Sequence, residues 1–192
     1  MAAQLGWYPH ARRARLPLIG SLKRPYILLL GSSAKHKNIE VILGQAQALD
    51  EAGIDLVVVG GASGIFAARE AVAARSNVHY AGFVGDDELV AFYENALCLV
   101  FPSKTEGFGI PPLEAMTKGC PVVSSNAASL VEVGVDALLY VDPDDGWREA
   151  IIGLSANAEL RAALAAKGRQ RAALFSWKRS AELYLDEILR LL

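Results

Sequence analysis

Two glutamates stand eight positions apart in FPSKTEGFGIPPLEAM, residues 101–116. Glu106 follows an apolar run typical of a strand, and Glu114 lies in the first turns of a predicted helix. A carboxylate accepts strong hydrogen bonds from two adjacent hydroxyls but is repelled by phosphate. The pair therefore predicts contacts with sugar hydroxyls, a ribose on one side and a hexose on the other. The alternative is that both are solvated residues at a helix start.

The loop between the glutamates predicts an anion site. Gly107 and Gly109 leave main-chain N–H groups accessible, and Pro111 and Pro112 suit the start of a helix. The first turn of a helix adds a partial positive charge. These features together favour a phosphate-bearing ligand held by the amides of residues 107–110.

A second anion candidate is GSSAKHKN, residues 31–38, which follows the first predicted strand. Lys37 stands at a helix start, with Asn38 as the predicted N-cap. Its ammonium would reach a phosphate held at the neighbouring strand end. An ordinary exposed loop lysine is the alternative.

Short β-rich runs alternate with helical stretches from residue 25 onward, which predicts parallel strands. Continuously apolar strands are typical of a sheet covered on both faces, so we expect a Rossmann-like, doubly wound α/β domain with ligands at the carboxyl edge. Helical spacing covers 39–49 and 86–96, and C-terminal helices are predicted near 157–173 and 177–191. The six predicted strands are 26–30, 55–59, 78–82, 97–101, 121–125 and 137–141.

Residues 1–24 have weak periodicity, and we interpret them as a connector or tail that precedes a domain spanning 25–192. Their basic residues are interpreted as a solvated linker, and a net charge of −2 offers no global attraction to nucleic acid. These basic residues are Arg12, Arg13, Arg15, Lys23 and Arg24.

The bulk composition predicts a globular protein, since 53% of the 192 residues are hydrophobic. No run reaches the roughly 20 apolar residues of a membrane helix, and no signal-peptide core follows Met1. Cys98 and Cys120 lack metal-like spacing and are predicted to be inert core thiols, which agrees with a reducing compartment. We expect a cytoplasmic location.

Other motifs are weak. The dinucleotide fingerprint G-x-G-x-x-G is absent, and no Ser-His-Asp, Cys-His or zinc spacing occurs. Asp142 and Asp144 form a D-x-D triplet that holds a divalent metal in some proteins, but their position after the last strand favours a turn and a helix cap.

Taken in order, several segments resemble the retaining family 4 (group 1) glycosyltransferases, which have two Rossmann-like domains in the GT-B arrangement. The resemblance covers about residues 25–190. It implies a metal-independent enzyme that moves a hexose, of the mannose type, from a nucleoside diphosphate sugar to a carbohydrate or lipid. The segments are GSSAKHKN, VHYAGFVGDDELVAFYENA, FPSKTEGFGIPPLEAM with GCPVVSSN, SLVEVGVDALLYVDP and FSW.

The resemblance also implies roles for individual residues. Glu106 would meet donor-sugar hydroxyls, Glu114 the ribose, Lys37 a phosphate, and the main chain at Val84 the base. The loop that approaches the diphosphate would be Gly107, Phe108, Gly109 and Ile110, and the first-strand loop would contribute Gly31 and Ser32, where many members carry arginine instead of Ser32.

The resemblance covers only the donor half of the family. The acceptor-binding domain has no counterpart among these residues, so we expect the chain alone to be inactive, with its last helix directed toward that domain. Peripheral membrane contact of the complete enzyme and self-association through an exposed docking surface stay open. So do two other functions: a stand-alone nucleotide-binding module, and a sugar-nucleotide epimerase, for which no convincing acid/base pair is found.

Overall fold

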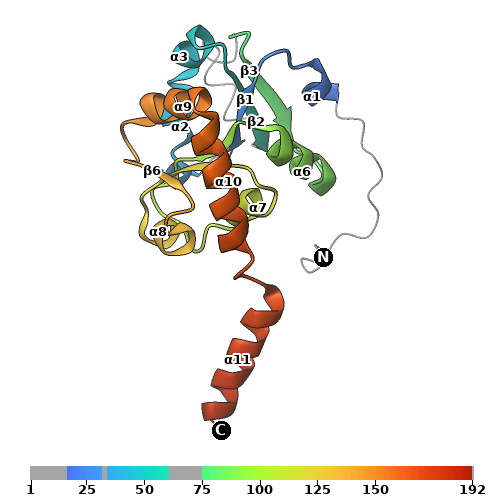
Figure 1. Cartoon of the computed structure of the whole chain (residues 1–192), viewed down its shortest axis with the longest axis vertical. Helices are drawn as coiled ribbons and strands as arrows, with labels where there is room; N and C mark the ends of the chain where they lie inside the picture. Colours follow the sequence, from blue (N-terminus) through green and yellow to red (C-terminus); the bar gives the residue numbers. More distant parts are fainter. Residues whose placement is uncertain (1–16, 32–33, 61–74, 192) are drawn as a thin grey trace.

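A computed structural model describes residues 17–31, 34–60 and 75–191 of the chain. Its centre is a six-stranded, all-parallel sheet with the strand order β3-β2-β1-β4-β5-β6 (Figure 1). The strands are β1 Tyr26–Gly31, β2 Asp55–Gly60, β3 Val78–Gly82, β4 Cys98–Phe101, β5 Val122–Ser125 and β6 Leu139–Val141. All six predicted strands are confirmed, with ends that shift by at most two residues.

Helices cover both faces of the sheet because alternate strand residues point to opposite sides. Ile27 and Leu29 belong to one buried cluster, whereas Leu28 belongs to the other. The described helices are α1 Pro17–Ser21, α2 Ile39–Leu43, α3 Ala46–Glu51, α6 Asp86–Asn95, α7 Ile110–Thr117, α8 Ala128–Gly134, α9 Trp147–Ala156, α10 Ala158–Ala172 and α11 Trp177–Leu191, with a 3-10 turn, η1, at Lys35–Lys37.

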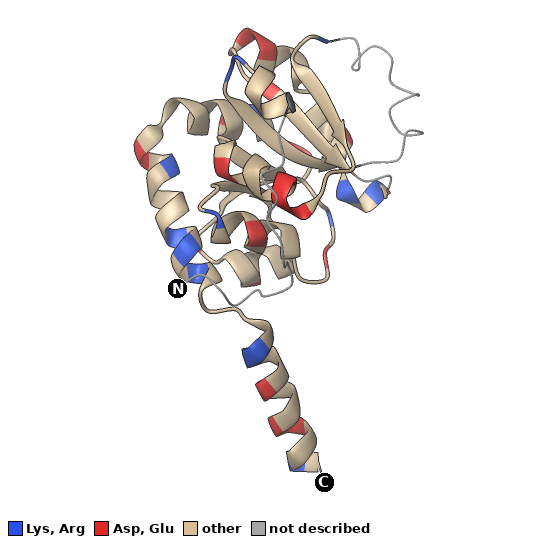
Figure 2. Ribbon diagram, turned by 90° about the vertical axis from the view of Figure 1, so that its right-hand side faces the viewer, with Lys and Arg blue, Asp and Glu red and all other residues tan. Residues whose placement is uncertain are grey.

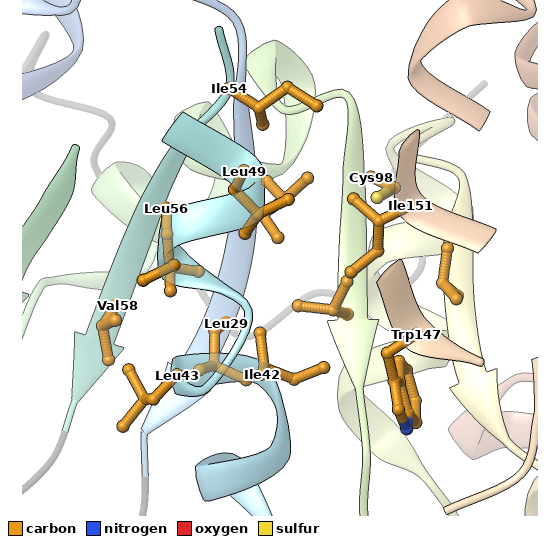
Figure 3. Packing of buried hydrophobic residues seen from close by; sticks show 14 of the residues in the cluster. Leu29, Ile42, Leu43, Leu49, Ile54, Leu56, Val58, Cys98, Trp147 and Ile151 are labelled. Carbon is orange, nitrogen blue, oxygen red and sulfur yellow. The ribbon is translucent and has the colours of Figure 1, made fainter. Parts of the chain in front are cut away.

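The first cluster joins α2, α3 and α9 to the sheet, and Trp147, Leu49 and Ile151 are almost fully buried there (Figure 3). The second cluster joins α6, α7 and α8 to the opposite face through residues such as Phe92 and Met116. Helix α10 contributes to both clusters. The prediction of a doubly wound α/β fold is therefore confirmed.

Two local predictions differ from the structure. The helix expected over 39–49 is divided into α2 and α3 near Gly44, although its apolar face stays buried across the break. Part of the expected connector is packed: α1 lies at 17–21, and Leu18, Ile19 and Leu22 contact the second cluster. Apolar residues at this spacing bury a face even in a short segment.

Arg24, expected to be a solvated linker residue, is ion-paired instead. Its guanidinium contacts Asp50 at 2.9 Å and Asp55 at 2.7 Å, and Asp55 also contacts His79 at 3.1 Å. Asp55 begins β2, so this network attaches residue 24 to the amino edge of the sheet, opposite the edge where ligands are expected. The other expected linker residues, Arg12, Arg13 and Arg15, lie outside the described residues.

Helix α11 extends away from the rest of the molecule in both views (Figures 1 and 2). Every described residue of this helix is exposed, and charges of both signs are distributed along it. The exposed residues include large apolar side chains, each at least 54% exposed: Trp177, Leu183, Tyr184, Leu185, Ile188, Leu189 and Leu191.

Candidate functional site

The strand order places the candidate site at the carboxyl ends of β1 and β4. These strands are neighbours, with Leu29 opposite Val100. The chain proceeds from β1 to β2 and β3 on one side, and from β4 to β5 and β6 on the other. The loops that follow β1 and β4 therefore turn in opposite directions, and such a switch point is where doubly wound sheets form their ligand crevice.

Lys37 and Glu106 meet at this switch point. Lys37 lies in η1 after β1, Glu106 lies in the loop after β4, and their Nζ and Oε1 atoms are 2.6 Å apart. The side chains are 27% and 11% exposed, so solvent screens the pair less than it would a surface ion pair. The amide of Lys104 also donates to the His36 carbonyl at 2.7 Å, which joins the two loops through the main chain.

Lys37 therefore has a carboxylate partner in the structure, and the phosphate contact that the sequence predicted stays a prediction. Its ammonium also lies 5.5 Å from the centroid of the Phe101 ring. A phosphate that reached Lys37 would compete with Glu106 for the same ammonium, because both are anions. Beside the pair, His36, Thr105, Glu106 and Gly107 line an open hollow.

The glycine loop presents main-chain N–H groups beside this ion pair. Among the described residues, no acceptor is bonded to the amides of residues 107–110. Gly109 has φ of 93°, and a Cβ atom at this position would lie 2.6 Å from Leu130 Cδ2. Gly107 would meet no atom within 4 Å. Backbone conformation and packing thus require glycine at 109, whereas at 107 it leaves the loop surface open.

Helix α7 begins directly after this loop, with prolines in its first turn as predicted. Its early N–H groups have no partner within the helix and give this end a partial positive charge. Phe108 and Ile110 are 44% and 47% exposed. The loop can therefore offer unpaired donors and apolar surface to a ligand.

Glu114 lies on α7, half-buried, and is engaged by a different partner from Glu106. The Tyr93 hydroxyl of α6 donates to Glu114 Oε2 at 3.4 Å. Burial is the largest cause that raises the pKa of Glu114, and the nearby Asp86 charge adds to it, whereas Tyr93 and Lys118 act in the opposite direction. The sequence predicted Tyr93 only as part of an apolar helix face, because a tyrosine pattern does not show where its hydroxyl points.

The remaining predicted donor contacts lie at the same edge of the sheet. Gly31 ends β1 opposite Gly60, and Val84 follows β3 with its side chain packed on the second cluster. Val84 has no main-chain hydrogen bond within the described part of the chain, and its contact with a base stays a prediction. Ser32 lies outside the described residues.

One capping prediction is confirmed in position only, and the other is wrong. Asn38 stands at the N-cap of α2 as predicted, with left-handed φ of 51°, but its side chain donates to the Pro143 carbonyl at 2.7 Å and makes no cap hydrogen bond. The triplet at 142–144 does form a turn, since the Asp144 amide donates to Asp142 Oδ1 at 2.9 Å. The helix that follows, however, has Gly146 at its N-cap and no side-chain cap.

Two absences concern only the described residues. Within 17–31, 34–60 and 75–191, no cluster of three or more His, Cys, Asp or Glu is arranged to hold a metal ion. No helix in those ranges is long and apolar enough to cross a bilayer. Cys98 and Cys120 are both free and buried as predicted, and burial raises the pKa of the Cys120 thiol to about 12.

The family of the chain follows from comparison with known proteins. Residues 18–171 match the family described as "Glycosyl transferases group 1". The chain therefore belongs to the group 1 glycosyltransferases. This assignment gives no support to the epimerase alternative.

Two curated relatives have mannosyltransferase names. An O-antigen chain mannosyltransferase of Salmonella typhimurium is 34% identical over 134 residues, which cover 67% of this chain and 38% of the relative. O-antigen chain mannosyltransferase B of Escherichia coli is 42% identical over 103 residues, or 53% of this chain and 27% of the relative. The chain thus spans less than half the length of these relatives.

Solved structures agree with the family. Sucrose-phosphate synthase from Thermosynechococcus elongatus superposes with a TM-score of 0.77 at 26% identity, over 91% of this chain and 47% of that one. WaaG, a glycosyltransferase involved in lipopolysaccharide biosynthesis, gives 0.68 at 26% identity, over 90% and 49%. The described fold therefore corresponds to about half of each of these structures.

Proposed function

We propose that this chain is the nucleotide-sugar-binding half of a retaining, family 4 glycosyltransferase in the GT-B arrangement. The complete enzyme would transfer a hexose, of the mannose type, from a nucleoside diphosphate donor to a carbohydrate or lipid acceptor in the cytoplasm. The observation that carries this proposal is the placement of Lys37, Glu106 and the unpaired amides of 107–110 together at the switch point of the sheet. The names of the curated relatives support mannose.

In this mechanism the donor diphosphate approaches the amides of the glycine loop and the start of α7. Lys37 leaves Glu106 and neutralises the negative charge that builds on the departing diphosphate. This electrostatic stabilisation of the transition state is stronger in a site that excludes part of the water than in bulk water. Glu106, released from the ion pair, orients the hexose through its hydroxyls. No step requires a metal ion.

Glu114 would hold the ribose. Its half-buried position on α7 and its hydrogen bond from Tyr93 restrict the position of the carboxylate beside the glycine loop. Val84, with its free main chain, would contact the base from the loop after β3. The base and the hexose would then bind on opposite sides of the diphosphate.

The acceptor would bind to a second domain, consistent with the fraction of the relatives that the chain spans. The apolar face of α11 is the surface we propose for contact with that domain, because a soluble chain seldom leaves so many large apolar side chains exposed on one helix.

Calorimetric titration of the 192-residue chain with UDP, GDP and ADP tests the proposal. We expect one nucleotide to bind, and Glu114→Ala to weaken it about 10- to 150-fold, since a hydrogen bond to a charged group is worth about 1.5 to 3 kcal/mol. Glu159→Ala, which changes an exposed glutamate in the first turn of α10, is the matched control. Failure of all three nucleotides to bind, or equal effects of the two variants, would contradict the proposal.

A further inference from the structure

An aromatic ring from far along the chain covers one side of the glycine loop. Phe175 lies in the short joint between α10 and α11, and its ring meets the ring of Phe108 edge to face. The centroids are 5.7 Å apart with an interplanar angle of 81°. This geometry is favourable for an aromatic pair. The joint therefore contacts the loop that carries the free amides.

Phe175 is itself held by Arg171, near the end of α10. The guanidinium carbon lies 4.9 Å from the centroid of the Phe175 ring, within the range of a cation–π interaction. Arg171 Nε donates to the Val133 carbonyl at 2.8 Å, and its Nη2 donates to the Glu132 carbonyl at 2.9 Å. Both carbonyls belong to the last turn of α8, where helix carbonyls lack internal partners.

Helix α8 also holds the glycine loop directly. The Ser129 hydroxyl donates to the Glu106 carbonyl at 2.9 Å, and the Leu130 side chain lies against Gly109. The loop thus contacts α8 directly at Glu106 and Gly109. It is also connected to α8 indirectly, because Phe108 contacts Phe175, Phe175 contacts Arg171, and Arg171 donates to carbonyls of α8. Between these points, the amides of 107–110 have no acceptor among the described residues.

We propose that Phe175 and Arg171 are positioning residues that hold these amides in the orientation a diphosphate requires. The inference rests on the proposed function, since it assumes that the loop binds phosphate. Loop amides that have no acceptor sample several orientations unless neighbouring side chains restrict the loop, and a restricted loop loses less entropy when a ligand binds. Neither residue would touch the nucleotide, so their loss should act on phosphate recognition and not on the base.

The test compares a nucleoside diphosphate with its monophosphate, using the base that binds the unaltered chain. In Phe175→Leu, we expect affinity for the diphosphate to fall about two- to tenfold, while affinity for the monophosphate changes much less. Arg171→Ala should act in the same direction, and Phe175→Tyr, which keeps the ring, should restore the difference. Tyr184→Leu, an exposed aromatic change on α11, is the matched control and should change neither affinity.

A diphosphate-to-monophosphate affinity ratio that stays the same in a folded Phe175→Leu variant would overturn the inference, as would equal weakening of both nucleotides. If Phe175→Leu does not fold, Phe108→Leu removes the same contact from a side chain that is 44% exposed, and an unchanged ratio there has the same meaning. Failure of the unaltered chain to bind any nucleotide is a different result, because it contradicts the proposed function itself.

Discussion

At the scale of single residues, the main finding is that Lys37 and Glu106 neutralise each other. The sequence predicted that Lys37 binds a phosphate and that Glu106 binds sugar hydroxyls. In the structure the two side chains contact each other, and each is proposed to bind a different part of the donor. An ion pair of this kind keeps a half-buried lysine and glutamate from being left unpaired, which would be costly. We infer that donor binding exchanges this ion pair for contacts with the ligand.

The exchange predicts the behaviour of Glu106→Gln in a complete enzyme that carries this domain. Turnover should fall about 100-fold, because the hexose would be held less accurately. Affinity for the free diphosphate should stay the same or rise, since Lys37 then has no competing carboxylate. Steady-state kinetics and calorimetry measure the two quantities, and equal losses in both would contradict the role assigned to Glu106.

The raised pKa of Glu114 predicts how the stability of the chain depends on pH. Burial raises this pKa in the folded chain above the ordinary value of 4.5, so the folded state binds the proton more tightly than the unfolded state. The free energy of unfolding contributed by this group is therefore greatest below about pH 4.5 and decreases as pH rises through the folded pKa.

Glu114→Gln removes this titration. The variant should gain stability relative to the unaltered chain as pH rises from 4 to 7, which urea unfolding at the two values can measure. Glu159→Gln, at an exposed position, is the matched control for replacing a glutamate by glutamine. If the stability of Glu114→Gln relative to the unaltered chain does not increase with pH, the pKa of Glu114 is not raised in the folded chain.

At the scale of elements, the two glycines of the loop have different physical roles. Gly109→Ala must place a Cβ atom at positive φ and against Leu130, so we expect about 2 to 4 kcal/mol of lost stability. Gly107→Ala meets open space and should change stability by less than about 0.5 kcal/mol. Its methyl group would instead occupy the ligand face and weaken nucleotide binding.

Thermal unfolding and calorimetry of the two variants check this contrast. A stable Gly109→Ala variant would show that the left-handed turn before α7 is not required. A Gly107→Ala variant that binds nucleotide normally would show that the ligand does not approach the loop there.

At the scale of the whole molecule, the domain body and α11 are energetically separate. The described residues of α11 are all exposed, so little apolar area is buried between it and the body. Ending the chain after Ser176 should change the free energy of unfolding of the body by less than about 0.5 kcal/mol. Denaturant unfolding measures this, and a larger loss would mean that α11 packs on the body in solution.

The same truncation tests the self-association that the exposed apolar face of α11 implies. Sedimentation velocity of the unaltered chain should show species larger than the monomer, and the truncated chain should be monomeric. Association that persists without residues 177–192 would mean that a different surface is responsible.

The sequence by itself determined the elements and the chemistry of the loop. Six apolar runs predicted six strands, and the spacing of Glu106, Gly107, Gly109 and Glu114 predicted a ligand loop, because hydrophobic periodicity and glycine conformations are local properties. The side-chain partners of Asn38 and Asp142 were less predictable, because a short polar side chain chooses among several nearby partners.

Only the tertiary structure decided which distant residues meet. Lys37 and Glu106 are 69 positions apart and meet because β1 and β4 are neighbours, which the linear sequence does not state. The contacts of Arg171 and Phe175 likewise depend on how α10 packs beside α8 and the glycine loop. Strand order and helix packing minimise the free energy of the whole chain, so no local pattern contains them.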